Sequence, residues 1–161
     1  MVVILMGVSG AGKTTVGRLL AAALGWTFYE GDDLHAPANV GKMSRGLPLT
    51  DEDRLPWLLA LRKLIEDCLQ RGENAVVTCS ALKRAYREIL KDGDAEVVFV
   101  YLKAAPRRIA ERLERRHGHF VKENLLESQL ATLEEPSPEE ALTVDASGSP
   151  EETVEEVRRK L

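Results

Sequence analysis

The sequence predicts an α/β fold in which helices cover both faces of a parallel β-sheet. Three observations support this prediction. Short apolar runs recur along the chain and are continuous rather than alternating, as in strands buried on both faces. Segments with helical periodicity separate these runs, which favours right-handed crossovers between parallel strands. A glycine-rich turn at residues 7–14 joins the first apolar run directly to the first helical segment.

Each element is expected where its pattern occurs. The apolar runs predict five strands, Val2–Met6, Thr27–Tyr29, Ala75–Cys79, Val97–Leu102 and Leu142–Val144. The periodic segments predict helices at Lys13–Leu24, roughly Leu55–Arg71, Lys83–Lys91, Pro106–Arg116, Lys122–Leu133 and Pro150–Lys160. Gly25 and Gly72 follow the first two helices, where glycine commonly ends a helix. The stretch from Asn39 is expected to be polar and irregular, with Thr50 or Asp51 capping the next helix.

Length and composition predict a single domain over residues 1–161 with a sizeable core. The chain is 44% hydrophobic and 30% charged, and its net charge of −4 argues against a general nucleic-acid binder. We find no apolar run long enough for a membrane span and no signal-peptide pattern. Cys68 and Cys79 are expected to be reduced thiols. These observations predict a cytoplasmic enzyme with no nucleic-acid or membrane partner.

The turn at residues 7–14 reads Gly-Val-Ser-Gly-Ala-Gly-Lys-Thr and fits G-x-x-x-x-G-K-(S/T), the phosphate-binding P-loop. Glycines let backbone N–H groups curl around phosphate oxygens, and the helix N-terminus adds partial positive charge. Lys13 would reach the β- and γ-phosphates, and the Thr14 hydroxyl would hold Mg²⁺. A chance match is the alternative, but the strand before the turn and the helix after it favour nucleotide binding. The expected phosphate-binding residues are Gly7, Ser9, Gly10, Ala11, Gly12, Lys13, Thr14 and Thr15.

Acidic residues follow the second predicted strand, in Glu30-Gly31-Asp32-Asp33-Leu34-His35. Because the ligand site of such a sheet lies at the carboxyl ends of its strands, these residues are expected to face the P-loop. One carboxylate can hold Mg²⁺ through water, and another can accept a proton from an attacking hydroxyl. The alternative is an acidic loop that caps the next helix. Three carboxylates beside a phosphate site are unfavourable without a cation, which favours the functional interpretation.

Basic residues follow the other strands. Lys42, Arg45 and Arg54 lie in or just after the irregular segment, and Lys83 and Arg87 are four residues apart, on one expected helix face. Cations at this rim suit an anionic substrate, although solvated surface charges would give the same pattern. After the fourth strand, arginines surround a helix that leads into a short loop; they are Arg108, Arg112, Arg115 and Arg116. Arginines on a mobile lid can stabilise a phosphoryl group in transfer, and a solvated basic helix is the alternative.

Together these segments resemble the bacterial gluconokinases, P-loop small-molecule kinases related to shikimate and adenylate kinases. The similarity covers Met1 to about Asp145 and rests on blocks beyond the P-loop. The blocks are Gly31-Asp32…Leu34-His35, Lys42-Met43, Asp51…Asp53-Arg54…Pro56-Trp57-Leu58, Cys79-Ser80-Ala81-Leu82-Lys83…Tyr86-Arg87, Arg116…Gly118-His119-Phe120 and Leu126…Ser128-Gln129. Two departures are Ala36, where the family usually has Pro, and Glu30, where Asp is common.

The resemblance implies a three-layer P-loop NTPase fold with a five-stranded parallel sheet and a helical lid at about residues 107–124. It implies that ATP, with Mg²⁺, phosphorylates D-gluconate at the 6-hydroxyl, giving 6-phospho-D-gluconate. Lys13, Asp32 and Arg116 would be catalytic, with Asp32 accepting the hydroxyl proton, and Thr14 and Glu30 would lie at the metal. Arg112 would bind on the lid or adenine side, and Asp145–Pro150 would form the adenine-side loop. Candidate substrate contacts are Asp32, His35, Lys42, Arg54, Lys83 and Arg87. A homodimer is also expected.

Two alternatives stay open at this stage. One is a kinase of the same fold acting on another small anion, such as shikimate or a nucleoside monophosphate. The blocks at residues 42–58 and 80–87 argue against it. The other is a nucleotide-dependent switch module without a metabolite acceptor. The chain lacks the Asn-Lys-x-Asp motif that reads guanine, and its second set of polar residues suits an acceptor.

Overall fold

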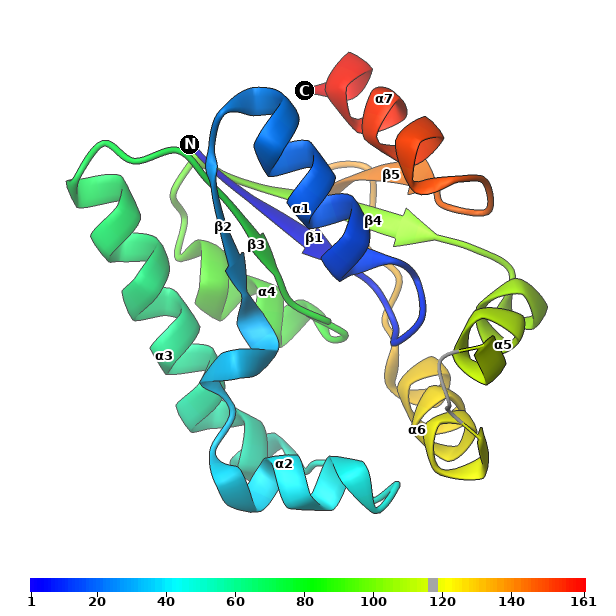
Figure 1. Ribbon diagram of the computed structural model, residues 1–161. Helices are drawn as coiled ribbons and strands as arrows, with labels where there is room; N and C mark the ends of the chain where they lie inside the picture. The colour runs from blue at the N-terminus through cyan, green and yellow to red at the C-terminus, as the bar shows by residue number, and fades with distance from the viewer. Residues whose placement is uncertain (116–118) are drawn as a thin grey trace.

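Five parallel strands form the centre of the molecule, in the order β2-β3-β1-β4-β5 (Figure 1). This computed structural model describes residues 1–115 and 119–161, without the side chains of 119–124. The strands are β1 (Val2–Met6), β2 (Thr27–Glu30), β3 (Ala75–Thr78), β4 (Val97–Lys103) and β5 (Ala141–Asp145). The helices are α1 (Lys13–Leu24), the short 3₁₀ helix η1 (Gly31–Leu34), α2 (Pro37–Ser44), α3 (Asp51–Gln70), α4 (Arg84–Lys91), α5 (Pro106–Arg115), α6 (His119–Thr132) and α7 (Pro150–Lys160).

The sheet divides the core into two layers, as its central strand β1 shows. All five residues of β1 are fully buried, and alternate side chains point to opposite faces of the sheet. Val3 and Leu5 belong to the cluster under α1 and α7, whereas Ile4 and Met6 belong to the cluster under α3 and α4. Figure 1 shows these two pairs of helices on opposite sides of the sheet, with α2, α5 and α6 toward the carboxyl ends of the strands. The predicted α/β architecture is confirmed.

The structure corrects one prediction between β2 and α3. The segment expected to be irregular contains α2, which begins with Pro37 at its first turn. Proline is well suited to a first helical turn, because its missing N–H has no partner there in any case. This helix buries only Asn39, so it carries no apolar periodicity that could have revealed it.

The start of α3 also differs from the prediction, by four residues. Thr50, one of the two predicted caps, caps the helix through a reciprocal capping box with Asp53, so the helix begins at Asp51 rather than near Leu55. The first turn consists of acidic residues, which are favourable at a helix N-terminus but add nothing to the apolar pattern. Gly25 and Gly72 adopt positive φ angles of 69° and 66° directly after α1 and α3, as expected for residues that end helices.

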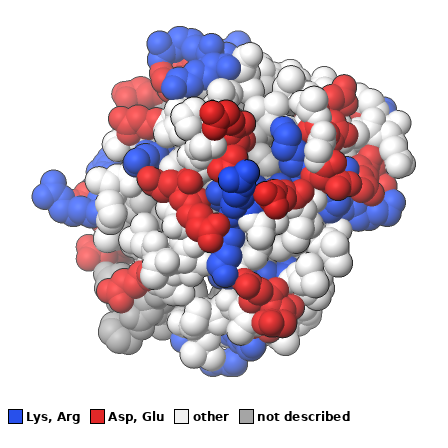
Figure 2. Space-filling model, turned by 180° about the vertical axis from the view of Figure 1, so that it is seen from behind, with Lys and Arg blue, Asp and Glu red and all other residues white. Residues whose placement is uncertain are grey.

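Charged side chains of both signs are interspersed on the surface. On α3 and α4, opposite charges pair one turn apart, as in Lys63 with Asp67 and Arg84 with Glu88. Figure 2 shows acidic and basic residues mixed across one whole face of the molecule. Cys68 and Cys79 are both buried and free. Within the described residues, no helix combines the length and apolar character needed to cross a membrane.

Candidate active site

The loop between β1 and α1 requires glycine at three positions. Gly7, Gly10 and Gly12 have φ angles of 148°, 86° and 98°, which other residues rarely adopt. A Cβ at Gly10 would also lie 2.8 Å from Cγ2 of Ile109, inside any normal contact distance. Gly12 is the N-cap of α1, so the first turn of that helix opens toward the loop. The loop therefore has the backbone of a phosphate-binding turn at a helix N-terminus.

Lys13 lies over this loop. Its ammonium group donates to the carbonyl oxygens of Gly7 at 2.9 Å and Val8 at 3.1 Å. Next to it, the Thr14 hydroxyl donates to Glu30 Oε2 at 2.5 Å, and the Thr78 hydroxyl donates to Glu30 Oε1 at 2.5 Å. Thr14 and Glu30, the two residues predicted to lie at the metal, are thus in direct contact. Their oxygen atoms are donors of the kind that Mg²⁺ prefers.

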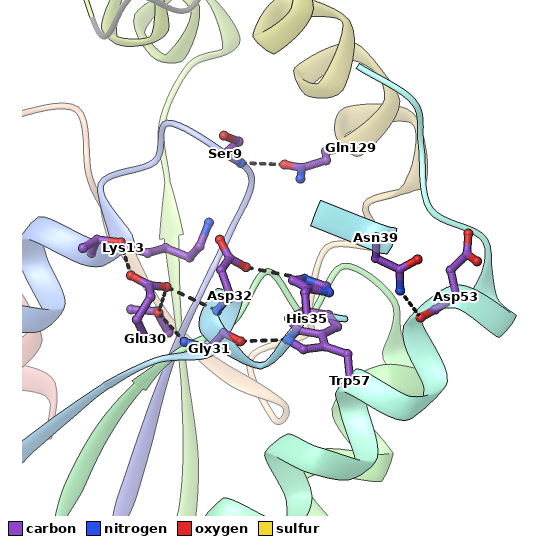
Figure 3. A network of polar contacts seen from close by, with 12 residues as sticks. Ser9, Lys13, Glu30, Gly31, Asp32, His35, Asn39, Asp53, Trp57 and Gln129 are labelled. Carbon is purple, nitrogen blue, oxygen red and sulfur yellow. Dashed lines mark hydrogen bonds and ion pairs between the residues drawn. The ribbon is translucent and has the colours of Figure 1, made fainter. Parts of the chain in front are cut away.

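The 3₁₀ helix η1 positions Asp32 beside the P-loop. A Cβ on Gly31 would lie 1.8 Å from the carbonyl oxygen of Thr78, so only glycine fits at the start of this turn. The Gly31 N–H donates to the Thr78 hydroxyl at 3.1 Å, and Trp57 Nε1 donates to the Gly31 carbonyl at 2.8 Å. Figure 3 shows the carboxylate of Asp32 next to the end of the Lys13 side chain. Since the Asp32 side chain is 65% exposed, it can reach a ligand.

His35 is buried behind Asp32. Its ring stacks on Trp57, with 4.0 Å between ring centroids, and its Nε2 lies 3.7 Å from Asp32 Oδ1. Burial lowers the pKa of the imidazole, the Asp32 carboxylate opposes this effect, and the Arg54 guanidinium adds to it. Among the described residues, His35 Nδ1 is a buried side-chain atom with no hydrogen-bond partner. Because this nitrogen is covered by protein atoms, the side of His35 that faces the site is its Nε2 next to Asp32.

The cations predicted to bind substrate separate into two groups. Arg54, Lys42 and Lys83 gather at the first turn of α3. Arg54 is buried, and its Nη1 donates to the Tyr86 hydroxyl at 3.0 Å. Lys83 Nζ donates to Asp51 Oδ1 at 3.0 Å, and Lys42 Nζ donates to Asp53 Oδ2 at 2.9 Å. Hydrogen bonds from Tyr86 and then from Lys83 hold the pKa of the Asp51 carboxyl below its ordinary value. A basic cluster with partly balanced charge therefore lies at the start of α3, near His35.

Arg87, also predicted to contact the substrate, does not lie in this cluster. Its side chain is only 3% exposed. The guanidinium donates to the carbonyl oxygens of Ala81 at 2.7 Å and Glu134 at 2.9 Å, and to Glu140 Oε1 at 3.3 Å. The expected shared helix face fails because Lys83 is the N-cap of α4 rather than a residue within it. These protein acceptors favour a structural role for Arg87 over a substrate contact.

Arg112 lies on the other side of the P-loop. Its guanidinium donates to the carbonyl oxygens of Ala11, Ala146 and Gly148. A cavity of about 280 Å³ lies here between the start of α1, α5 and the loop after β5, with Thr15 and Pro150 in its lining. This is where the resemblance predicts the adenine side, and Arg112 lines this cavity. Arg116, predicted to be catalytic, lies outside the described residues.

Three polar residues that the sequence analysis did not assign to the active site also form hydrogen bonds there. Asp51 and Tyr86 connect the cations of the α3–α4 cluster, and the Tyr86 hydroxyl donates to Asp51. Gln129 of α6 accepts a hydrogen bond from the Ser9 N–H at 2.6 Å. All three belong to the sequence blocks that carry the family resemblance. Nothing else in the sequence indicated that they would lie at the site.

Comparison with known proteins decides the family. The gluconokinase of Gluconobacter oxydans (strain 621H) is 50% identical over 157 residues, covering 97% of this chain and 88% of that protein. This chain belongs to the gluconokinase family. A solved gluconokinase from Sinorhizobium meliloti 1021 shares 46% identity with a TM-score of 0.85, covering 96% of this chain and 87% of that one. A solved sugar kinase from Janibacter sp. HTCC2649 shares 43% identity with a TM-score of 0.90, covering 98% and 92%.

More distant similarities agree at the level of the fold. The family model described as AAA domain matches residues 2–136. Solved shikimate kinases share 20–21% identity with TM-scores of 0.59–0.70, which shows a common fold and no more. The gluconokinase family, the P-loop kinase fold and the phosphotransferase class, all predicted from sequence, are therefore confirmed, and ATP is the phosphate donor that a P-loop kinase implies.

Proposed function

We propose that this protein transfers the γ-phosphoryl group of ATP to the 6-hydroxyl of D-gluconate, giving 6-phospho-D-gluconate and ADP. The observation that carries the proposal is that the P-loop lysine and the Asp32 carboxylate lie at the same edge of the sheet, in a member of the gluconokinase family. Phosphoryl transfer needs a donor site and an acceptor site in this arrangement, with the reacting hydroxyl between them.

Different residues would bind the phosphates and activate the hydroxyl. The N–H groups of the P-loop and the Lys13 ammonium would hold the β- and γ-phosphates. Asp32 would orient the 6-hydroxyl toward the γ-phosphorus and accept its proton as the new O–P bond forms and the bond to ADP breaks. Because the transition state of phosphoryl transfer is loose, correct positioning matters more here than a strong base.

Mg²⁺ fits beside Thr14 and Glu30. The Thr14 hydroxyl would be a direct ligand, and the Glu30 carboxylate would act through water. The described part of the chain has no cluster of three or more His, Cys, Asp or Glu side chains that could hold a metal. The remaining ligands would therefore be phosphate oxygens and water. The ion would neutralise charge on the phosphates.

Arg54 is the best candidate for the gluconate carboxylate. Its guanidinium is close enough to His35 to add to the lowering of the pKa of that imidazole, which supports a role on the same side of the site as Asp32. Among the described residues, its one hydrogen-bond acceptor is the Tyr86 hydroxyl, so N–H groups are left for a ligand. Lys42 and Lys83 already bind carboxylates of α3 and would contact hydroxyls instead. His35 would act through Asp32, since its Nε2 lies 3.7 Å from Asp32 Oδ1.

The test is ADP release by the purified protein with Mg-ATP, alone and with D-gluconate, its C-5 epimer idonate, shikimate or AMP. The proposal predicts strong stimulation by D-gluconate and little by shikimate or AMP. Stimulation by another acceptor would keep the phosphoryl chemistry and overturn the substrate. Stimulation by none would favour a nucleotide-binding switch. Light scattering of the same sample would test the homodimer that the family resemblance implies.

A further inference from the structure

Thr78 carries a buried hydroxyl group to which the proposed function gives no role. It is the last residue of β3, and it is fully buried. In the sheet it lies opposite Glu30 of β2 on one side and Leu5 of β1 on the other. Thr78 therefore lies at the carboxyl edge of the sheet, between the strand that leads into the P-loop and the strand that leads into η1.

The Thr78 hydroxyl has two partners, and their chemistry fixes its direction. Its oxygen accepts from the Gly31 N–H at 3.1 Å, and it donates to Glu30 Oε1 at 2.5 Å. Because a hydroxyl has one hydrogen and the Gly31 N–H can only donate, that hydrogen is left for the carboxylate. The methyl group of Thr78 faces α1, where a Cβ on Gly17 would lie 3.2 Å from it. Packing of the methyl group against α1 thus favours the rotamer that directs the hydroxyl to Glu30.

Glu30 is held at both of its carboxylate oxygens. Oε1 accepts from Thr78, and Oε2 accepts from the Thr14 hydroxyl at 2.5 Å. The Asp32 N–H also donates to Oε1, at the long distance of 3.5 Å. Figure 3 shows Glu30 directly before the turn that carries Asp32. Since a long side chain loses much rotamer freedom when it is ordered, the contact at Thr14 alone would hold the carboxylate less firmly. The second hydroxyl fixes its orientation beside the group that would bind Mg²⁺.

We propose that Thr78 is a positioning residue for Mg²⁺, because its hydroxyl orients the Glu30 carboxylate toward a water ligand of the ion. Groups that lie behind the contacts of a metal ion set its affinity by fixing the orientation of those contacts. Thr78 would act only through Glu30, since its own side chain is covered by protein. This inference rests on the Mg²⁺ site of the proposed function and not on the identity of the acceptor.

Thr78→Val and Thr78→Ser separate the two halves of this side chain. Val keeps the methyl group and loses the hydroxyl, whereas Ser keeps the hydroxyl and loses the methyl group. Calorimetry without any acceptor gives the ATP affinity in excess Mg²⁺ and in EDTA, and the ratio of the two measures the effect of Mg²⁺. Thr78→Val should lower this ratio about 3- to 30-fold, with the affinity in EDTA within about twofold of the wild type.

Thr78→Ser should keep the wild-type ratio, although its lost packing should lower the midpoint of urea unfolding. Thr132→Val is the matched control, because it makes the same change at a hydroxyl that bonds the Ser128 carbonyl within α6. It should also keep the ratio. If Thr78→Val does not fold, Thr78→Ala takes its place, because Ala differs from Ser only by the hydroxyl.

A double variant tests whether Thr78 acts through Glu30. Glu30→Gln should lower the ratio by itself, and adding Thr78→Val to it should change the ratio no further. Two independent, additive losses would overturn the proposal. So would an unchanged ratio in Thr78→Val, or an equal fall in Thr78→Ser.

The wild-type protein separates this inference from the proposed function. An ATP affinity that did not depend on Mg²⁺ would overturn the positioning role of Thr78. A Mg²⁺-dependent affinity without stimulation of ADP release by gluconate would overturn only the proposed acceptor.

Discussion

Asp32 and His35 show how single residues acquire their roles from their surroundings. Asp32 is exposed at the P-loop, whereas His35 lies buried five residues from Glu30, stacked on Trp57. The carboxylate can therefore meet a ligand while the imidazole stays neutral behind it. The buried and unpaired Nδ1 of His35 is an uncommon feature, because most buried polar atoms have a hydrogen-bond partner.

The role of Asp32 can be tested by removing its charge. Asp32→Asn keeps the shape of the side chain but can no longer accept the hydroxyl proton. The turnover number with gluconate should fall by about 10²–10⁴-fold, while ATP affinity stays close to that of the wild type. Steady-state kinetics and calorimetry measure the two quantities. Asp33→Asn, at the next residue of η1, is the matched control and should retain activity. Full turnover by Asp32→Asn would remove Asp32 from its assigned role.

Arg54 is expected to determine the affinity for the acceptor. Arg54→Lys keeps the positive charge but loses the planar N–H array that pairs with a carboxylate. The KM for gluconate should rise about 10- to 100-fold while the KM for ATP changes little. Arg62→Lys is the matched control, because Arg62 is also a largely buried arginine of α3 but bonds Glu66 and the Leu90 carbonyl. An unchanged KM for gluconate in Arg54→Lys would assign the carboxylate to another cation.

At the scale of elements, Arg87 holds α4 against the segment that precedes β5. One guanidinium reaches the Ala81 carbonyl before α4 and the Glu134 carbonyl after α6. Ala81 has a positive φ of 46°, which is uncommon for a residue other than glycine. The Ser80 carbonyl just before it accepts from the Gly7 N–H, so this cross-link also supports the start of the P-loop.

Loss of this cross-link should lower the stability of the fold more than it changes substrate binding. Arg87→Met leaves the Glu140 carboxylate and two carbonyl groups without their partner, so the free energy of unfolding should fall by about 3 kcal/mol. Denaturant unfolding measures this change. Arg84→Met, on the exposed side of the same helix, should lie within about 0.5 kcal/mol of the wild type. A raised KM for gluconate in Arg87→Met without loss of stability would restore Arg87 as a substrate contact.

At the scale of the whole molecule, stability should depend on pH through His35. Its pKa in the folded protein is lowered from the ordinary value of 6.5, so below pH 6.5 the unfolded chain binds more protons than the folded one. Stability should therefore be highest above pH 6.5 and fall as the pH decreases toward the folded-state pKa. The contributions of paired carboxylates to the stability of the fold are lost at lower pH than that of His35. Glu73, for example, is held mainly by Arg71 and has a pKa of about 2.

Urea unfolding at pH 8 and pH 5 measures this effect, with His35→Asn as the comparison. The wild type should lose more stability between these values than the variant does, because the variant has no imidazole to protonate. Since the two proteins share all other titrating groups, their difference isolates His35. Equal losses in the two proteins would show that His35 titrates alike in both states.

The five strands and the P-loop were predictable because each is a local pattern. Continuous apolar runs define β1, β3 and β4, whereas the edge strands β2 and β5 are shorter apolar stretches with polar residues, and the Gly-Lys-Thr spacing places the turn between β1 and α1 without any knowledge of the rest of the chain. Segment boundaries differed by a few residues where caps and acidic first turns, rather than apolar periodicity, begin a helix. The short helix α2 was missed because it buries almost nothing.

The sequence by itself determined the fold class, the phosphate loop and, through its motif blocks, the family. Only the tertiary structure decided what each cation does. Lys83 and Arg87 look alike in sequence. Lys83 binds Asp51 at the start of α3, whereas Arg87 donates to three hydrogen-bond acceptors in the interior. Likewise, nothing local predicts that Gln129 would meet Ser9. The physical reason is that glycine turns and apolar periodicity act over neighbouring residues, whereas a hydrogen-bond partner depends on which distant segments the packed sheet brings together.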